Sequence, residues 1–277
     1  MDVLAEIVAD TRRRVQARKA AAQEYASDGR AAETTVGGPA TGDAGHPGRR
    51  PFRDALAQPG LSVIAEHKRS SPSAGTIRDD LTLEQVVGAY ERGGAAALSI
   101  LTEESRFGGS LADIDAARAV TQLPILRKDF IVDPYQVTEA ALHGASAILL
   151  IVAAFPGDVD SLAALQVAAA DLGLDVLMEV HDAAELDVAL ALDAPIVGVN
   201  NRNLSTLRVD LATTYELLPL IPDGVVRVAE SGFRTPGEVR RLAHAGVDAA
   251  LIGEALMRSD DLEAACRQLI GAGAPAP

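Results

Sequence analysis

Two lysines stand at the ends of apolar segments that are typical of buried strands. Lys68 follows the segment 61–66, and Lys128 ends the segment 124–128. A buried ammonium group is costly unless it meets an opposite charge or carries out chemistry. We therefore expect both lysines to face carboxylates.

Other polar residues occupy equivalent positions at the ends of apolar segments. A lysine near a carboxylate can donate a proton, and a glutamate beside apolar walls can accept one. The alternative is that these residues form ion pairs that only stiffen one edge of the fold. The polar residues at these positions include Glu66, Glu179, Asn200, Arg202 and Glu230.

Small residues follow the last two apolar segments. Ser231 and Gly232 follow one segment, and Gly253 and Glu254 follow the other. Backbone N–H groups and the start of a short helix can bind a phosphate at such places. Each motif alone is weak, because a glycine after a strand is usually only a turn. Together they predict a phosphate site.

The stretch Ser71 to Gly75 is rich in small residues and too long for a tight turn. We expect it to form a lid, with a solvated loop as the alternative. His67 lies between Glu66 and Lys68, so in an extended segment it should point to the opposite face and pack there. The histidines form no pair four residues apart and have no neighbouring cysteine, so no metal site is expected.

A regular alternation of apolar and helix-like segments must position these residues. The strands are predicted at 61–66, 96–101, 124–128, 146–152, 175–180, 195–200, 225–230 and 248–253. The helices predicted between them include 81–92, 134–143, 161–172, 183–191 and 236–245, and the Asp133-Pro134 pair suits the start of one of them.

The fold class predicted from this alternation is α/β, a (β/α)8 TIM barrel with an additional N-terminal helix. Strands that are apolar on both faces indicate a parallel sheet covered by helices. An open doubly wound sheet is the alternative, but no G-x-G-x-x-G follows the first strand. In a barrel, the polar strand ends would meet at one rim.

The expected domain organisation divides the chain at residue 50. Residues 1–50 would hold a helix at about 2–19 and a flexible Gly/Ala/Pro-rich linker at 29–50. Residues 51–277 would form the barrel.

The overall composition limits the partners. The net charge of -14 argues against a nucleic-acid groove and an anionic membrane surface, but a phosphorylated small molecule remains possible at a local positive site. The single cysteine, Cys266, fits a reducing compartment. No apolar run approaches the roughly 20 residues that span a bilayer, so a cytoplasmic location is expected.

Seven motifs in unbroken order resemble the indole-3-glycerol phosphate synthase family of tryptophan biosynthesis. They cover about residues 63–258, and the N-terminal helix extends the resemblance. The motifs are I-A-E-H-K-R-S-S-P-S-A-G, L-T-E-E-S-R-F-G-G-S-L, L-R-K-D-F-I-V-D-P-Y-Q-V, L-M-E-V-H, G-V-N-N-R-N-L, A-E-S-G and I-G-E-A-L-M-R.

The resemblance implies a barrel enzyme that converts 1-(2-carboxyphenylamino)-1-deoxyribulose 5-phosphate into indole-3-glycerol phosphate, carbon dioxide and water without a cofactor. It implies that Lys128 is the general acid, that Glu179 is the general base and that Lys68 holds the substrate carboxylate. Glu66 would pair with Lys68, and Asp129 is read as a supporting neighbour of Lys128.

The remaining implied roles concern substrate contacts. Asn200 and Glu230 would surround the sugar hydroxyls and the lysines, and Phe107 and the Ser71 loop would cover the substrate. Ser231, Gly232, Gly253 and Glu254 match phosphate-binding positions. The chain differs from the expected pattern at His67, at Ala74 and in its long linker.

Two rival functions use the same fold. A phosphosugar isomerase, such as phosphoribosylanthranilate isomerase, fits a rim with two lysines less well. A non-catalytic paralogue that keeps the phosphate site is opposed by the presence of Lys68, Lys128 and Glu179 together. Association with other enzymes of the tryptophan pathway is a further expectation from the resemblance.

Overall fold

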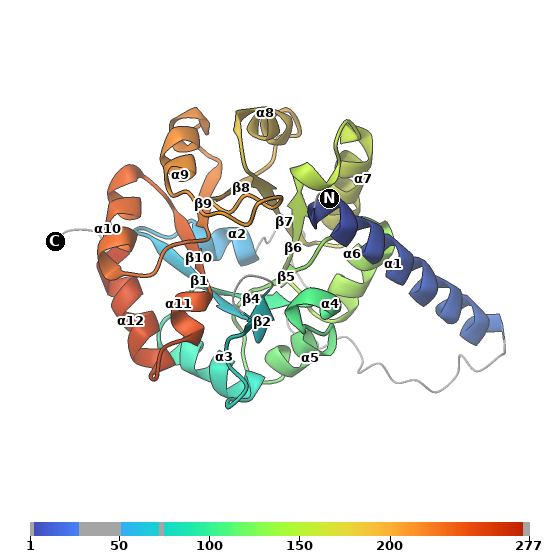
Figure 1. The fold of residues 1–277 in the computed structure, drawn as a ribbon, viewed down its shortest axis with the longest axis horizontal. Coiled ribbons are helices and arrows are strands. Elements are labelled where there is room, and N and C mark those ends of the chain that lie inside the picture. The colour runs from blue at the N-terminus through green and yellow to red at the C-terminus, as the bar shows by residue number, and fades with distance from the viewer. Residues whose placement is uncertain (1–2, 28–50, 72–74, 274–277) are drawn as a thin grey trace.

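Eight parallel strands close into a barrel in the computed structural model, which describes residues 3–27, 51–71 and 75–273 (Figure 1). Each strand pairs with its neighbours along the chain, and the ring closes where Ser62 lies opposite Ala249. The strands are β1 (Ser62–His67), β4 (Ala97–Leu101), β5 (Ile125–Lys128), β6 (Ala147–Ile151), β7 (Asp175–Val180), β8 (Ile196–Asn200), β9 (Val226–Glu230) and β10 (Ala249–Ile252).

Helices surround this ring, and their apolar faces pack against the strands (Figure 1). α3, for example, buries Leu83, Val86, Val87 and Tyr90, which share one face because they recur every three or four residues. The outer helices are α3 (Leu83–Arg92), α5 (Ala112–Arg118), α6 (Pro134–Leu142), α7 (Val159–Asp171), α8 (Ala183–Ala191), α9 (Ala212–Leu217), α10 (Pro236–Ala245) and α12 (Leu262–Gly273).

Polar caps fix where several of these helices begin. Thr82 and Thr235 form capping boxes at α3 and α10, where each threonine accepts a hydrogen bond from the third helical residue. Asp133 caps α6 with Pro134 as the first helical residue, as the sequence predicts.

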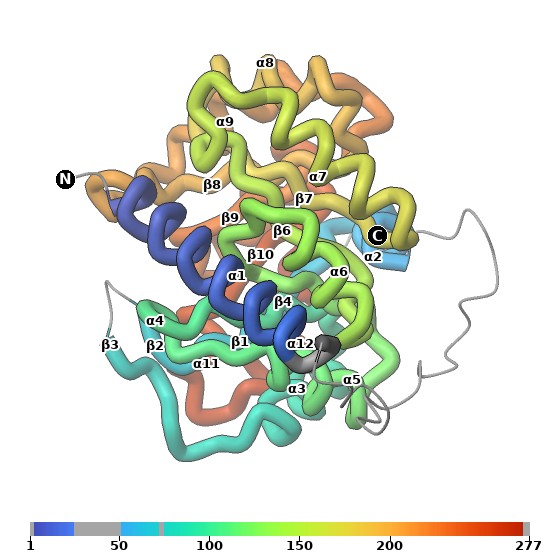
Figure 2. Tube along the Cα trace, turned by 90° about the vertical axis from the view of Figure 1, so that its right-hand side faces the viewer, coloured from blue at the N-terminus to red at the C-terminus, as the bar shows by residue number. Residues whose placement is uncertain are grey.

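The N-terminal helix α1 (Val3–Ser27) lies outside the ring, against α6 and the short helix η1 (Val152–Ala154) (Figure 2). Leu4, Ile7 and Val8 belong to the same apolar core as the barrel, and Val15 is also buried. Because α1 ends at Ser27, it runs beyond the predicted end at about residue 19. The predicted linker at 29–50 lies outside the described residues.

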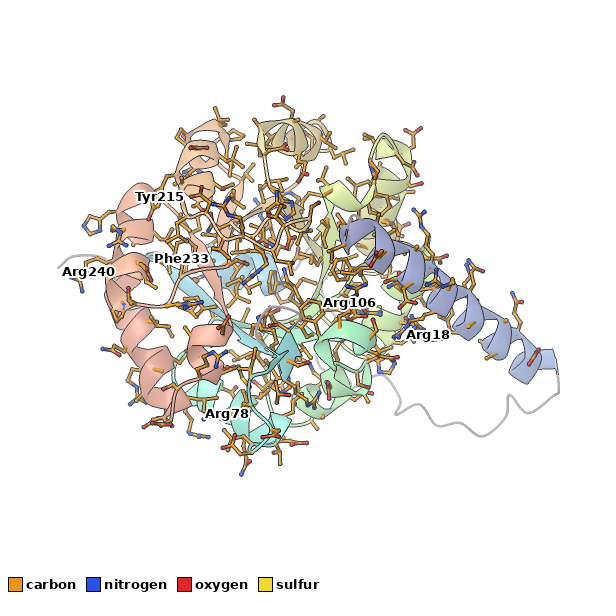
Figure 3. All side chains as sticks on the ribbon, viewed as in Figure 1. Arg18, Arg78, Arg106, Tyr215, Phe233 and Arg240 are labelled. Atoms are coloured by element: carbon orange, nitrogen blue, oxygen red, sulfur yellow. The ribbon has the colours of Figure 1, made fainter. Side chains whose placement is uncertain are left out.

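Ion pairs flank this apolar contact of α1. Arg18 donates two hydrogen bonds to Glu139 on α6, and Lys19 pairs with Asp133. Near the start of α1, Glu6 pairs with Arg106. Figure 3 labels Arg18 and Arg106 on this side of the molecule. The charges therefore border a contact that is apolar at its centre.

Small elements complete the two ends of the barrel. The helix α2 (Pro51–Leu56) packs against β1, β4 and β7 through the fully buried Phe52 and Leu56, and Arg53 N–H donates to Asp175 at the start of β7. At the other end lie α4 (Glu104–Phe107), α11 (Glu254–Met257) and a hairpin of β2 (Ser70–Ser71) and β3 (Gly75–Thr76). One short helix, η2 (Leu218–Leu220), follows α9.

The first and last parts of the barrel meet. Leu61 N–H donates to the carbonyl of Gly273, the last residue of α12, at 3.0 Å. A side chain on Gly273 would collide with Leu61, so a glycine is needed for this close approach.

The predicted barrel is confirmed, and every predicted strand agrees with an observed strand to within about one residue at either end. The hairpin occupies part of the predicted loop after β1, whose residues 72–74 lie outside the described part of the chain. In the part that is described, no helix is both long and apolar enough to span a membrane.

Candidate active site

One cavity of about 410 Å³ opens at the C-terminal ends of the strands, where barrel enzymes carry their active sites. All but one of the predicted site residues line it. The lining residues that the sequence predicts are Glu66, Lys68, Phe107, Lys128, Glu179, Asn200, Arg202, Glu230, Ser231, Gly232, Gly253 and Glu254.

The centre of the cavity holds a cluster of one lysine and two glutamates, here called the Lys128 cluster. Lys128 Nζ lies 2.8 Å from Glu179 Oε2 and 2.6 Å from Glu230 Oε2. The three side chains come from β5, β7 and β9, so only the closed barrel brings them together. The predicted charge network is present.

The electrostatics of the Lys128 cluster follow from burial and pairing. Burial alone would lower the pKa of Lys128, but Glu179, Glu230 and Glu66 raise it overall. Burial would raise the pKa of Glu179, and the charge of Lys128 together with His181 lowers it instead. Burial raises the pKa of Glu230 to about 8, although Lys128 opposes the rise. The cluster therefore contains one firm carboxylate and one carboxyl group that readily holds a proton.

A second ion pair lies beside this cluster. Lys68 Nζ donates to Glu66 Oε1 at 2.7 Å, and the charge of Glu66 also reaches Lys128. Between them His67 is buried, and it does not line the cavity, which agrees with its predicted packing role. Burial and the charge of Arg69 lower the pKa of His67 to about 4.

Two glycines make room for the carboxylates. A Cβ atom on Gly198 would collide with Glu230 Oε1, and one on Gly253 would collide with Glu66 Oε1. Gly198 lies in the middle of β8, and sequence reasoning did not single it out. Its role becomes visible only when β8 and β9 are placed side by side.

The predicted phosphate positions lie directly after two neighbouring strands, β9 and β10. Ser231 and Gly232 have φ angles of 65° and 94°, and Gly232 lies beneath Val209 and Leu211, where a side chain would not fit. Across the gap, Gly253 precedes α11. Such turns expose backbone N–H groups toward a ligand.

The side chain of Glu254 has another task. It accepts a hydrogen bond from Arg258 at 3.1 Å and lies 3.8 Å from Arg234. A carboxylate repels phosphate, so only the backbone of Glu254 could serve the predicted phosphate site. Arg234 also lines the cavity and adds positive charge at this side, although the sequence analysis did not name it.

Asn201 fixes the turn after β9. Its Nδ2 donates to the carbonyls of Glu230 and Ser231 at 3.0 and 3.1 Å, and its Oδ1 accepts from Thr214. Sequence reasoning singled out the preceding residue, Asn200, because it ends a predicted strand. The buried amide of Asn201 therefore fixes the backbone of Glu230 and Ser231 at the start of the turn.

The expectations for Ser71, for the lid and for Asp129 differ from the structure or concern residues outside its described part. Ser71 lies in the hairpin and is not among the residues that line the cavity. Its predicted lid includes residues outside the described part of the chain. Asp129 bonds to Arg127, Thr102 and the N–H of Phe130, so it supports the fully buried Arg127 and not Lys128 as expected.

Many known proteins are similar in sequence to this chain, and several of them are described as indole-3-glycerol phosphate synthase. Residues 4–269 match the profile of the family described as indole-3-glycerol phosphate synthase. The chain belongs to the indole-3-glycerol phosphate synthase family. The family's synthase from Kineococcus radiotolerans is 52% identical over 225 residues, which cover 80% of each chain. The one from Rhodococcus jostii is 49% identical over 220 residues, 79% of this chain and 81% of the relative.

Two solved structures with much lower sequence identity have the same fold as this chain. A 3-hexulose-6-phosphate synthase from Salmonella typhimurium has a TM-score of 0.61 at 15% identity, covering 76% of this chain and 98% of the other. KGPDC from Streptococcus mutans has a TM-score of 0.60 at 11% identity and covers 77% of this chain and 97% of the other.

Proposed function

We propose that the chain catalyses the reaction for which its family is named, the formation of indole-3-glycerol phosphate. The substrate would be 1-(2-carboxyphenylamino)-1-deoxyribulose 5-phosphate, and carbon dioxide and water would leave. The observation that carries the proposal is the Lys128 cluster, which places a half-buried acid between two carboxylates in the lining of a cavity with phosphate-type turns on one side.

Ring closure requires an acid at the ketone oxygen. The aromatic carbon that bears the carboxylate forms a bond to the ketone carbon, and the oxygen gains negative charge as that bond forms. Lys128, charged and held by Glu179 and Glu230, would deliver a proton to this oxygen. Lys68 would hold the substrate carboxylate until it departs as carbon dioxide.

Dehydration then requires a base and an acid. The new hydroxyl group leaves with a proton, and a neighbouring proton must be removed to form the indole double bond. Glu179 is the ionised carboxylate of the cluster and would take that proton. Lys68, or Lys128 after it has been reprotonated, would protonate the leaving hydroxyl group. Asn200 lies at the end of β8 with its side chain at the cavity, within reach of the sugar hydroxyls.

The phosphate would lie at the turns of Ser231, Gly232 and Gly253, with backbone N–H groups as donors. Phe107 and Arg202 line the cavity and would contact the substrate there. A phosphosugar isomerase would use the same phosphate site, but it would leave one lysine–glutamate pair without a task.

A fluorescence assay tests the proposed function. Purified chain incubated with the carboxyphenylamino substrate should generate indole fluorescence, and Lys128→Met should lose roughly 10³-fold in kcat, within the usual range for a general acid. The variant should still bind inorganic phosphate, since the proposed donors are backbone N–H groups of the turns and not the Lys128 side chain. Wild-type chain that isomerises phosphoribosylanthranilate but yields no indole product would contradict the proposal.

We further propose that the chain works in the cytoplasm and that residues 1–50 and 51–277 are its two structural parts. The negative net charge and the single buried cysteine support the first statement. Association with other enzymes of the tryptophan pathway would follow from the shared intermediates. Cell fractionation and co-purification test these expectations.

A further inference from the structure

The two carboxylates of the Lys128 cluster have unlike surroundings. Their distances to Lys128 Nζ, 2.8 and 2.6 Å, are nearly equal, so the lysine alone does not distinguish them. Glu230 Oε1 is buried over Gly198 and makes no hydrogen bond among the described residues. Glu179, in contrast, has a second cationic group beside its other oxygen.

That group is His181, one residue beyond β7. Its Nε2 lies 3.4 Å from Glu179 Oε1, and its Nδ1 lies 2.9 Å from Glu185 Oε2 on the first turn of α8. Glu185 also accepts the backbone N–H of His181 at 2.8 Å. The imidazole is therefore clamped by one carboxylate while it faces another.

The carboxylates that face His181 favour its protonated form, whereas the ammonium group of Lys128, which contacts the other oxygen of Glu179, opposes it. Glu179 faces it from β7 and Glu185 from α8, while Asp182 turns its carboxylate to the N–H of Glu185. The short helix η1 packs against both β7 and α8 and contributes only Val and Ala side chains. Burial opposes the charge, but the ion pair with Glu179 and the hydrogen bond with Glu185 raise the pKa of His181 to about 10.

We propose that His181 is a positioning residue which, held by Glu185, fixes the orientation and the ionised form of Glu179, so that Glu179 and not Glu230 acts as the base. This inference rests on the proposed function. When two carboxylates share one cation, the one with a second cation stays ionised and the other takes up a proton first. His181 thus breaks the near-symmetry of the Lys128 cluster without touching the substrate.

The pH profile of His181→Gln tests this inference. Glutamine retains an N–H donor near the position of Nε2 and loses the charge. Removing a nearby cation raises the pKa of a carboxylate by about one unit or more. We therefore expect the acidic limb of kcat to move up by about one pH unit and kcat to fall about 10-fold, with KM changed less than kcat.

A matched control is His143→Gln. His143 also pairs with an aspartate, Asp115 at 2.8 Å, but on the outside of the barrel. It should keep the wild-type profile. An acidic limb in His181→Gln that coincides with wild type would overturn the inference, even if the melting temperature fell, because a purely structural role predicts that result. Glu185→Gln should shift the limb in the same direction by a smaller amount.

Nitrogen-15 NMR of the imidazole rings provides a readout without substrate. In the wild-type chain at about pH 8, His181 should be doubly protonated, since it is flanked by two carboxylates. A neutral His181 ring at that pH would overturn the inference while leaving the proposed function intact. Absence of indole formation by the wild-type chain would instead contradict the proposed function.

Discussion

At the scale of single residues, Glu179 and Glu230 differ in their tendency to bind a proton because their surroundings differ. Lys128 contacts two glutamates at similar distances, yet burial raises the pKa of Glu230, and His181 helps to lower the pKa of Glu179. Pairs of carboxyl groups with divergent environments are a general way to separate an acid from a base. The same chemical group therefore has two different roles within a few ångströms.

Replacing each glutamate by glutamine should reveal this difference. Glu179→Gln removes the carboxylate that we propose as the base, and we expect kcat to fall by roughly 10²-fold or more. Glu230→Gln resembles the protonated form of Glu230 and should cost clearly less. The indole fluorescence assay measures both variants near neutral pH. Equal losses of kcat in the two variants would indicate that both glutamates act only by holding Lys128.

A methyl group at residue 198 should disturb the site without changing a titratable group. Gly198→Ala places a Cβ atom too close to Glu230 Oε1, so the Glu230 side chain must leave its present position beside Lys128. We expect about a 10-fold loss in kcat, and overpacking of this kind costs about 1–3 kcal/mol of stability.

Gly237→Ala in α10 is the control for this substitution, because a Cβ atom there meets nothing within 4 Å. It should leave kcat unchanged and stabilise the helix slightly. Denaturant unfolding and the kinetic assay measure both variants. An active, undisturbed Gly198→Ala would show that the barrel can relax around Glu230.

At the scale of elements, α1 combines apolar and charged contacts of unequal value. Ile7 is buried in the core, whereas the Arg18 side chain remains 38% exposed beside Glu139. We expect Ile7→Ala to lower the free energy of unfolding by about 2–4 kcal/mol and Arg18→Ala by about 1 kcal/mol or less.

Urea denaturation of the two variants compares these contributions. If Arg18→Ala costs more than Ile7→Ala, the ion pairs hold α1 in place. The opposite result assigns that function to the apolar face, with the charges setting the register of the helix against α6.

The elements also show where sequence reasoning succeeds. The barrel strands were predictable because each is an apolar run between turn residues, and the capped helices α6, α8 and α10 begin where Asp133, Asp182 and Thr235 place them. Short elements such as α4 and the β2–β3 hairpin have too few residues for a periodic pattern. The end of α1 was missed because the alanine-rich stretch beyond residue 19 continues the helix without an apolar stripe.

The residues of the candidate site that stand at strand ends were predictable from the sequence, whereas the residues that support them were not. Lys128, Glu179 and Glu230 end apolar runs, so their position at the rim follows from the fold. Asn201 and His181 act through other residues, and their partners lie far along the chain or on a following helix. No local spacing indicates such contacts, which require the closed barrel.

At the scale of the whole molecule, the charged His181 links stability to pH. Its folded pKa of about 10 exceeds the ordinary value of 6.5, so its contribution is fully present below about pH 6.5 and is lost as the pH rises toward 10. The loss is at most about 1.4 kcal/mol per pH unit.

The difference in unfolding free energy between wild type and His181→Gln should therefore shrink as the pH rises from about 7 to about 10. Urea denaturation at a series of pH values measures this difference. A difference that stays constant over that interval would mean that His181 is neutral in the folded protein.

The meeting of Leu61 and Gly273 has a consequence for how the chain could be cut. A ring of eight units has no intrinsic beginning, and the natural one is only the point where α12 returns to β1. A circular permutant of residues 51–273, which leaves out α1, would link α12 to α2 by a few residues and start at the exposed turn around Gly157, between β6 and α7; it would keep the order of neighbours around the rim. The Lys128 cluster would then be assembled from the two ends of a rearranged chain.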